Sequence, residues 1–231
     1  MEKVSQGLKF FLETVFHGLR FLGFYNKAFC LNLDDSLDVI ARLPCPVAGP
    51  SYLVTASEVA TLQFAREVLN LPVPRVITWS GAKRGQPNSV GADYIIMEKV
   101  SGVHLGNRWE RFDSADDVIP IMDSVFNLQA KFESVCFSRI GSLYFKEDVS
   151  ADLQTVPLLT GSIDATTRQL SERYRVGPLI NPQWWRGVRA RMPLDRGPCM
   201  ASLPVLYCYS FANFCHLRAR RVLLFHCRCK K

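Results

Sequence analysis

Hydrophobic positions recur with helical spacing in three stretches of the chain, at about residues 1–20, 55–69 and 114–135. Apolar residues at intervals of three and four lie on one face of a helix, which can then pack on a core. The sequence therefore predicts three amphipathic helices. Their apolar positions are Leu8, Phe11, Leu12, Val15, Phe16 and Leu19 in the first, Val59, Leu62, Ala65 and Leu69 in the second, and Val118, Ile121, Met122, Val125, Phe126, Leu128 and Phe132 in the third.

The second of these helices carries signals for its start and its end. Thr55 and Glu58 have the spacing of a capping box, in which each side chain accepts a hydrogen bond from a backbone N–H of the first turn. Pro72 and Pro74 cannot continue a helix. We expect this helix to run from Thr55 to about Leu69.

Strand-like stretches lie between the helices. Residues 25–33 and 37–43 flank the turn-forming sequence Asp34-Asp35-Ser36 and predict a hairpin, and residues 74–80, 92–100 and 140–145 predict further strands. Residues 150–198 are rich in Pro and Gly and are expected to be mostly loops. The order helix, hairpin, helix, strand, strand, helix predicts an α+β fold. It would contain a mostly antiparallel sheet with one packed helix, followed by a switch to helical structure.

Composition narrows the class of protein. The chain has 231 residues, of which 48% are hydrophobic and 21% charged, and this excludes wholesale disorder, collagen-like repeats and coiled coil. The net charge is +7, but residues 199–231 contain six basic residues and no acidic one, so residues 1–198 are close to neutral. A basic tail on a neutral body argues against a nucleic-acid-binding face. The cysteines of the body, Cys30, Cys45 and Cys136, are expected to be reduced thiols.

Four features of the body have the order found in nucleotide-binding lobes of the kinase type. They are a turn-forming stretch at Gly23–Lys27, a cation at Arg42, a carboxylate at Glu58 and an apolar strand that leads into residues 98–102. In such lobes a loop covers the phosphates, a strand cation contacts them, a helix carboxylate holds the cation, and the backbone after the apolar strand pairs with adenine. Taken alone, Arg42 and Glu58 are also compatible with an ordinary surface ion pair, and Lys27 with a solvated turn residue.

Longer segments strengthen this hypothesis. The sequence resembles the aminoglycoside phosphotransferase-like, protein-kinase-like family, and within it the fungal branch that includes altered inheritance of mitochondria protein 9. The resemblance spans about residues 22–198. It rests on FYNKAF, VIARLPCPVAGP, TASEVATLQFAREVLNLPVPRVITWS, VGADYIIMEKVSGVHLGNRW and IGSLYF, and on the later NPQWW and LDRGP. It implies a two-lobed kinase-like fold that uses ATP and Mg²⁺ to phosphorylate a small-molecule hydroxyl.

The resemblance also implies a set of nucleotide-binding residues. By position, Gly23, Asn26 and Lys27 correspond to the phosphate-covering turn, Arg42 to the strand cation, Glu58 to its helix partner, and Met97, Glu98 and Val100 to the hinge. One position departs from the family pattern, because the strand cation is generally Lys. Arg keeps the charge but presents a planar fork of donors instead of a point charge.

The catalytic half of the family pattern is missing from the sequence. Phosphoryl transfer in this family requires a His-x-Asp-x4-Asn loop and a further metal-binding Asp. None of the four histidines is followed two residues later by Asp, and no Asp or Glu follows Asp195. We therefore assign no catalytic and no metal-binding residue. We expect that this chain does not transfer phosphate on its own and serves either as part of a kinase-like enzyme or as an inactive interaction module.

The expected organisation has four parts. Residues 1–21 form a helical extension, 22–100 the kinase-like nucleotide-binding lobe, 101–198 the incomplete start of a helical lobe, and 199–231 a basic, Cys-rich tail. The tail is compatible with a terminus unrelated to the family or with a membrane anchor over residues 199–217. A zinc site is disfavoured by the spacing of its candidate ligands, which are Cys208, Cys215, His216, His226, Cys227 and Cys229.

The remaining expectations concern partners, location and the packing of single residues. The partners are a nucleotide and an unidentified small-molecule acceptor, with no nucleic acid, and the location is the mitochondrion by resemblance or the cytoplasm. Trp184 and Trp185 are expected to pack a loop on the body, the alternative being a cap on a substrate groove, and Asp195 to be structural. The helix at 114–135 lacks the lobe against which it would pack, so its apolar face is expected to be exposed and to promote self-association.

Overall fold

The structure is a computed structural model that describes residues 26–32, 38–80, 90–109 and 111–200. Within these residues the fold is mixed α/β, with an antiparallel sheet as expected. The expected helix at 1–20 lies outside the described residues, as does most of the basic tail.

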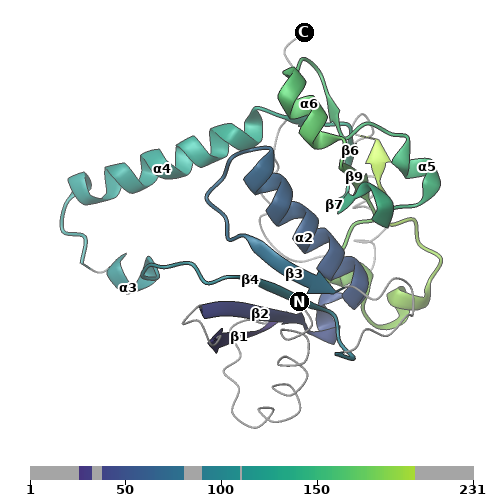
Figure 1. The fold of residues 1–231 in the computed structure, drawn as a ribbon, viewed down its shortest axis with the longest axis horizontal. Coiled ribbons are helices and arrows are strands. Elements are labelled where there is room, and N and C mark those ends of the chain that lie inside the picture. The colour runs from purple at the N-terminus through teal and green to yellow at the C-terminus, as the bar shows by residue number, and fades with distance from the viewer. Residues whose placement is uncertain (1–25, 33–37, 81–89, 110, 201–231) are drawn as a thin grey trace.

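The central element is a four-stranded antiparallel sheet in the order β1-β2-β4-β3 (Figure 1). Its strands are β1 (Asn26–Asn32), β2 (Asp38–Pro44), β3 (Val76–Ser80) and β4 (Tyr94–Glu98). The first two strands pair in the register Asn26 to Pro44 through Asn32 to Asp38, which confirms the expected hairpin. Strands β3 and β4 confirm the strands expected at 74–80 and 92–100.

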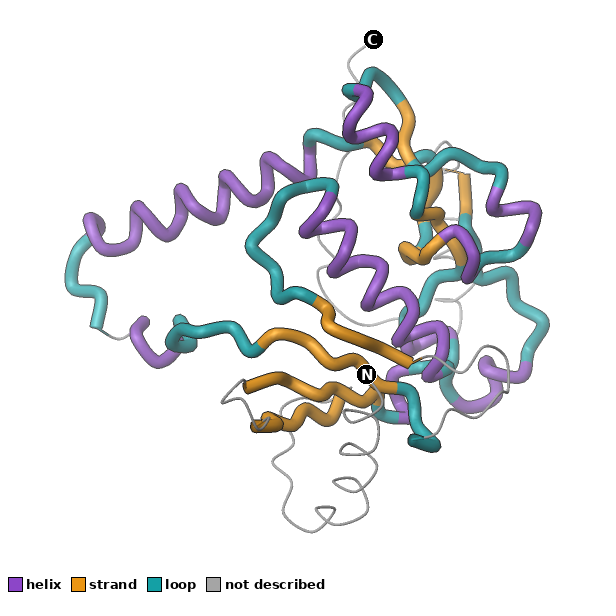
Figure 2. Tube along the Cα trace, viewed as in Figure 1, coloured by secondary structure: helices purple, strands orange, loops and turns teal. Residues whose placement is uncertain are grey.

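Helix α2 (Ser51–Glu67) follows a short 3-10 turn, η1 (Pro46–Ala48), and runs across one face of the sheet (Figure 2). Successive side chains of a strand point to opposite faces, so alternate residues of β4 face α2. Ile95 and Met97 belong to the same buried cluster as Val59 and Phe64 of the helix. On the opposite face of the sheet a second buried cluster contains Phe29, Val39, Ala41, Tyr94 and Ile96.

The start of α2 differs from the prediction. The helix begins at Ser51 with Pro50 as its N-cap and without a side-chain cap hydrogen bond, so Thr55 lies inside the helix and not at its start. The φ of Pro50 is −61°, and a fixed φ of this kind suits the entry to a helix. Thr55 is buried. The capping-box interpretation of Thr55 and Glu58 is therefore wrong, and Glu58 has another role.

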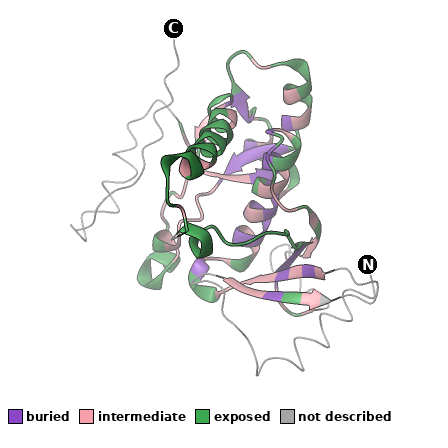
Figure 3. Ribbon diagram, turned by 90° about the vertical axis from the view of Figure 1, so that its left-hand side faces the viewer, coloured by how far each residue is buried: buried purple, intermediate pink, exposed green. Residues whose placement is uncertain are grey.

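The segment after the sheet forms α3 (Gly106–Trp109) and α4 (Ala115–Glu133), and α4 projects away from α2 and the sheet (Figure 1). Pro120 lies inside this helix, past its first turn, and so it has no N–H to donate to the carbonyl oxygen of Asp116. No residue of α4 is buried, and Figure 3 shows most of the helix in the exposed colour. The helix expected at 114–135 and its exposed apolar face are both confirmed.

The remaining described residues differ from the expected helical lobe, because short strands alternate with short helices. The strands are β5 (Cys136–Phe137), β6 (Arg139–Ile140), β7 (Ser142–Phe145), β8 (Leu159–Thr160), β9 (Tyr174–Gly177) and β10 (Cys199–Met200). The helices are η3 (Lys146–Asp148), α5 (Ala151–Gln154), α6 (Ala165–Ser171), η4 (Pro182–Trp184) and η5 (Gly187–Arg191). The strands form three antiparallel pairs, β5 with β8, β6 with β10, and β7 with β9.

Two features of this region bear on the predictions. The strand expected at 140–145 is divided at Gly141, where a Cβ atom would lie 2.3 Å from the carbonyl oxygen of Gly177. The region is held to the sheet through α2, because β7 packs on that helix and Tyr144, Phe145 and Tyr174 enter the core. Helix α2 is therefore packed between the sheet and the β7–β9 pair.

The loop that contains Trp184 and Trp185 contacts the segment before α2, as expected, since Arg186 donates to the carbonyl oxygen of Val47 at 3.2 Å and the Trp185 ring lies next to Gly49. The indole N–H of Trp185 donates to the carbonyl oxygen of Leu179 at 3.0 Å, and the guanidinium of Arg196 lies 4.1 Å from the centre of its ring. Asp195 accepts a hydrogen bond from the backbone N–H of Gly197 at 2.9 Å, which fits its expected structural role.

Candidate functional site

The candidate site is centred on an ion pair between the sheet and α2. A guanidinium nitrogen of Arg42, on β2, contacts a carboxylate oxygen of Glu58, on α2. Arg42 is near the end of β2, and the chain returns through η1 into α2. The early part of α2, which carries Glu58, therefore lies next to Arg42. The two residues are 16 positions apart in the sequence, and the structure brings them together as the sequence predicted.

The environment of this pair is partly buried. The side chain of Arg42 is 33% exposed and that of Glu58 is 21% exposed. Burial raises the pKa of Glu58 above its ordinary value of 4.5, although the charge of Arg42 and its hydrogen bond both act to lower it. The desolvation of the carboxylate therefore outweighs the attraction of its partner. A guanidinium presents its N–H donors as a planar fork, a geometry that matches the oxygens of carboxylates and phosphates.

The residues assigned to the phosphate-covering turn are placed differently from the prediction. Asn26 and Lys27 belong to β1, where they pair with Pro44 and Leu43, and so they do not lie in a turn. The reason is the full-length pairing of β1 with β2, which extends the hairpin ladder to the first described residue. Gly23 lies outside the described residues.

The expected hinge lies at the end of β4. Met97 and Glu98 are the last residues of that strand, and Met97 is buried in the cluster under α2. The backbone N–H of Glu98 donates to the carbonyl oxygen of Arg75 at 2.9 Å, so it is used by the protein itself. Val100 follows in an exposed connection towards α3.

A second ion pair at the hinge was missed by the sequence analysis. The Nζ atom of Lys99 lies 2.5 Å from an oxygen of Asp38, at the start of β2. The hydrogen bond from Lys99 to Asp38 and the carboxylate charge raise the pKa of this exposed ammonium. Val39 of β2 pairs with Glu98 of β4, and this register places Asp38 beside Lys99. The register between β2 and β4 was not part of the sequence-based prediction.

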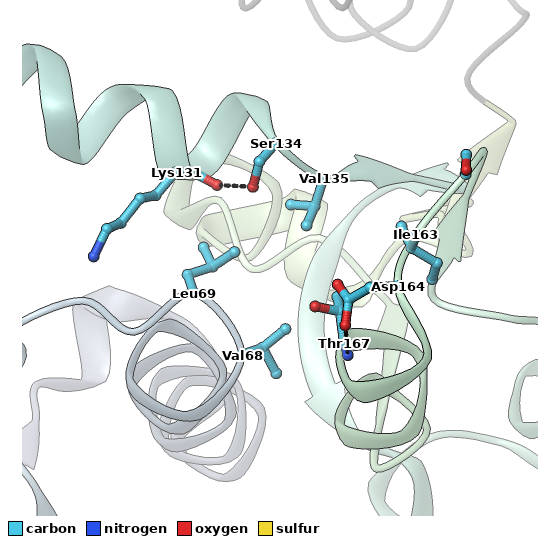
Figure 4. A pocket seen from close by; sticks show the side chains of 9 residues that line it. Val68, Leu69, Lys131, Ser134, Val135, Ile163, Asp164 and Thr167 are labelled. Carbon is cyan, nitrogen blue, oxygen red and sulfur yellow. Dashed lines mark hydrogen bonds between the residues drawn. The ribbon is translucent and has the colours of Figure 1, made fainter.

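A pocket of about 200 Å³ lies elsewhere, between the ends of α2 and α4 and the start of α6 (Figure 4). Lys131 donates to the carbonyl oxygen of Asn70 at 2.6 Å, and Asp164 caps α6 by accepting from the backbone N–H of Thr167 at 2.9 Å. Lys131 therefore joins the end of α4 to the segment after α2, and the carboxylate of Asp164 is used within α6. None of the residues expected to bind nucleotide lines this pocket.

Two further findings concern the described residues only. They contain no group of three or more His, Cys, Asp or Glu side chains that could hold a metal ion. They also contain no helix that is both long and apolar enough to cross a membrane. The alternative membrane segment 199–217 lies almost wholly outside the described residues, and the disfavoured zinc candidates lie wholly outside them, so the structure tests neither.

Comparison with known proteins gives relatives over most of the chain. A subtelomeric hrmA-associated cluster protein of Aspergillus fumigatus is 39% identical over 180 residues, which are 78% of this chain and 32% of the relative. Altered inheritance of mitochondria protein 9, mitochondrial, of Candida tropicalis is 30% identical over 203 residues, which are 83% of this chain and 32% of the relative. The protein of the same name in Candida albicans is 29% identical over 202 residues, 83% of this chain and 31% of the relative.

These matches cover only part of each relative, since the chain spans about a third of their length. No protein-family model matches the chain, and no solved structure matches it. The Candida relatives are named mitochondrial, which supports the mitochondrial location expected from the resemblance. The chain is thus a homologue of the altered inheritance of mitochondria 9 proteins of yeasts and of a subtelomeric cluster protein of Aspergillus fumigatus.

Proposed function

We propose that the four-stranded sheet and α2 form the nucleotide-binding lobe of a kinase-like fold of the aminoglycoside phosphotransferase type. In this proposal ATP, with Mg²⁺, binds on the face of the sheet that carries Arg42. The observation that carries the proposal is the ion pair between Arg42 and Glu58. It joins a strand cation to a helix carboxylate, which is the arrangement that orders nucleotide phosphates in kinase-like lobes.

The topology around the ion pair supports the same proposal. The order of elements along the chain is hairpin, helix, strand, apolar strand, and the spatial order of the strands is β1-β2-β4-β3. This arrangement puts the cation of β2 next to α2 and puts the apolar strand β4 beside β2, with its end leading into the connection at residues 99–105. A nucleotide lying along β2 would reach Arg42 with its phosphates and the end of β4 with its base.

The energetics of the ion pair also favour a role in binding. Removing a carboxylate from water costs free energy, and the raised pKa of Glu58 indicates that Arg42 does not fully repay that cost. A pair that contributes little to stability is well suited to hold a guanidinium in place for an anionic ligand. Phosphate oxygens accept charge-assisted hydrogen bonds from such a fork.

We further infer that these 231 residues bind nucleotide without transferring phosphate. Transfer to a small-molecule hydroxyl requires a base or orienting Asp and metal-binding side chains after the hinge. The sequence contains no His-x-Asp loop, and no acidic residue follows Asp195. The mitochondrial names of several relatives lead us to propose the mitochondrion as the site of this binding.

Isothermal titration of the full chain with ATP and Mg²⁺ tests this proposal. We expect binding that weakens at least about tenfold in Arg42→Ala, since loss of a charge-assisted hydrogen bond costs about 1.5–3 kcal/mol. The matched control is Arg173→Ala, because Arg173 pairs with Glu67 near the other end of the same helix at 2.6 Å. It should leave the affinity unchanged. Binding that survives Arg42→Ala would contradict the proposed site.

A second candidate function is supported by a different observation. Helix α4 presents an apolar face that no described residue covers, which is typical of a surface that contacts another protein. If the folded chain fails to bind ATP, we propose instead that it is an inactive kinase-like interaction module. If both the wild type and Arg42→Ala bind ATP, with equal affinity, the result contradicts the proposed nucleotide site and this alternative as well.

A further inference from the structure

The face of the sheet opposite α2 carries an apolar surface over strands β1, β2 and β4. Strand residues alternate between the two faces, so the residues next to those that face α2 all point to the other side. On β1, β2 and β4 these positions are apolar except at two strand ends, where Lys27 and Glu98 lie. The apolar residues are Phe29, Leu31, Val39, Ala41, Leu43, Tyr94 and Ile96.

This apolar surface is covered. Val39 and Ala41 are 0% exposed and Ile96 is 1% exposed. In the described part of the chain, the partly buried apolar side chains that pack against this cluster are Leu31, Leu43 and Val90. Leu31 and Leu43 are neighbours within the same sheet, and Val90 lies just before β4. Neighbours in the plane of a sheet do not shield its face from water, so another layer must lie over it.

The beginning of the chain has the pattern that such a layer requires. Residues 1–20 carry an apolar stripe at helical spacing, formed by Leu8, Phe11, Leu12, Val15, Phe16 and Leu19. A helix of 20 residues would be about 30 Å long. Strands of seven residues, such as β1 and β2, are about 23 Å long. One such helix is therefore long enough to cover the cluster.

The connection to the sheet also fits. Strand β1 begins at Asn26, so only residues 21–25 join the predicted helix to the edge of the sheet. Five residues span up to about 17 Å, and packed layers lie about 10 Å apart. The other segments outside the described ranges fit less well. Residues 33–37 and 81–89 are short and polar, and residues 201–231 follow β10, which pairs with β6 in the other half of the molecule.

We propose that residues 1–20 dock as an amphipathic helix on the face of the sheet opposite α2 and form its third layer. The sheet would then be packed between α2 and this helix, with an apolar cluster on each of its faces. The proposal has a consequence that rests on the proposed function. Docking would fix residues 21–25 at the start of β1, and Gly23 of the expected phosphate-covering turn is among them.

Hydrogen–deuterium exchange of the full chain tests the docking without using nucleotide. The variant Leu12→Asp/Phe16→Asp places two charges on the apolar stripe. We expect the backbone amides of β1 and β2 to exchange roughly tenfold faster or more, because the sheet loses its cover. The matched control, Gln6→Asp/His17→Asp, adds two charges on the opposite side of the same predicted helix. It should leave the exchange of both strands unchanged.

Two outcomes of this experiment would overturn the proposal. One is equal exchange of β1 and β2 in the wild type and in Leu12→Asp/Phe16→Asp. The other is faster exchange of these strands in Phe211→Asp/Phe214→Asp, which would assign the cover to the tail. Since neither outcome involves ATP, a failure of the docking is distinguishable from a failure of the nucleotide site.

A cross-linking measurement keeps the test decisive if the charged variant does not fold. Phe16→p-benzoylphenylalanine retains an aromatic side chain at the apolar stripe. After illumination we expect cross-links within the same chain to residues 26–44 and 94–98. Cross-links to α4, or to a second copy of the chain, would overturn the proposal.

Discussion

Arg42 and Glu58 form an ion pair between β2 and α2, yet the pKa of Glu58 is raised above its ordinary value. Burial is the largest cause of this shift, and the two contributions of Arg42 oppose it. The ionised carboxylate is thus held in a position that costs free energy. An ion pair whose formation does not stabilise the fold is consistent with the proposed role in positioning a guanidinium for a nucleotide.

The first prediction concerns Glu58→Gln and the pH dependence of stability. A raised pKa in the folded state means that folding favours protonated Glu58. The associated stability is present below about 4.5 and is lost as the pH rises through the folded pKa. We expect Glu58→Gln to lack this loss. Its free energy of unfolding should be equal to that of the wild type or higher by about 1 kcal/mol at pH 7, because Gln mimics the protonated carboxyl that folding favours.

Urea denaturation of both proteins between pH 4 and pH 8 checks this prediction. The difference in free energy of unfolding should favour the variant increasingly as the pH rises from about 4.5. ATP affinity should fall in the same variant, so that stability and binding change in opposite directions. A variant that is markedly less stable than the wild type at pH 7 would mean that the ion pair serves the fold.

The second prediction concerns a buried cation on β9. The side chain of Arg175 is 4% exposed and donates to the carbonyl oxygens of Gln154 at 2.8 Å, Glu172 at 3.0 Å and Tyr174 at 2.6 Å. Arg175→Leu would leave these acceptors without their donor. We expect a loss of about 3 kcal/mol in the free energy of unfolding, because unpaired buried groups are costly.

Arg173→Leu is the matched control for this loss. Arg173 is two residues away and its side chain is 53% exposed, although it also forms an ion pair, with Glu67. Exposed ion pairs contribute little, so its replacement should cost less than about 1 kcal/mol. Thermal and urea unfolding of both variants measure the contrast. Equal losses would show that Arg175 does not have the structural role that its buried contacts indicate.

Much of the sheet and the central ion pair could be predicted from the sequence. The alternation of apolar residues and the turn at residues 34–36 predict β1 and β2, and spacing in the chain predicts that Arg42 meets Glu58. These features depend on local pattern, or on elements that follow one another directly. The pairing of Asp38 with Lys99 could not be predicted in the same way, because it depends on the register between β2 and β4.

The errors of the sequence analysis have a common physical cause. Thr55 resembled an N-cap because Ser, Thr, Asp and Asn favour that position, but the helix starts four residues earlier and buries Thr55 in the core. The strands of residues 136–177 are only two to four residues long, too short for an alternating pattern to be recognised. In both cases tertiary packing decides the structure, and a local signal cannot report it.

The third prediction uses the close approach of β9 to a buried tyrosine. A Cβ atom at Gly177 would lie 2.7 Å from Cδ2 of Tyr144 and 3.0 Å from Cγ1 of Val149. Tyr144 cannot easily move, since it is fully buried and its hydroxyl donates to the carbonyl oxygen of Pro178 at 2.9 Å. We expect Gly177→Ala to lower the free energy of unfolding by about 2 kcal/mol. A urea midpoint equal to that of the wild type would contradict this packing.

The last prediction concerns the apolar face of α4, which the sequence analysis expected to be exposed. Phe126 is 60% exposed, and Ile119 and Met122, on the same side of the helix, are 53% and 41% exposed. Large apolar side chains that remain in water favour association, by about 1.5–3 kcal/mol for each side chain that becomes fully buried. We therefore expect the chain to self-associate through α4 as its concentration rises.

Sedimentation velocity over a range of concentrations measures this association. Phe126→Lys should raise the concentration at which half of the chain is associated by roughly tenfold or more, since 1.4 kcal/mol corresponds to a factor of ten. Asn127→Lys is the control, because it adds the same charge one residue away on the opposite side of α4. If both variants change association equally, net charge rather than the apolar face controls it. A wild-type chain that stays monomeric at all concentrations would show that this face does not drive association.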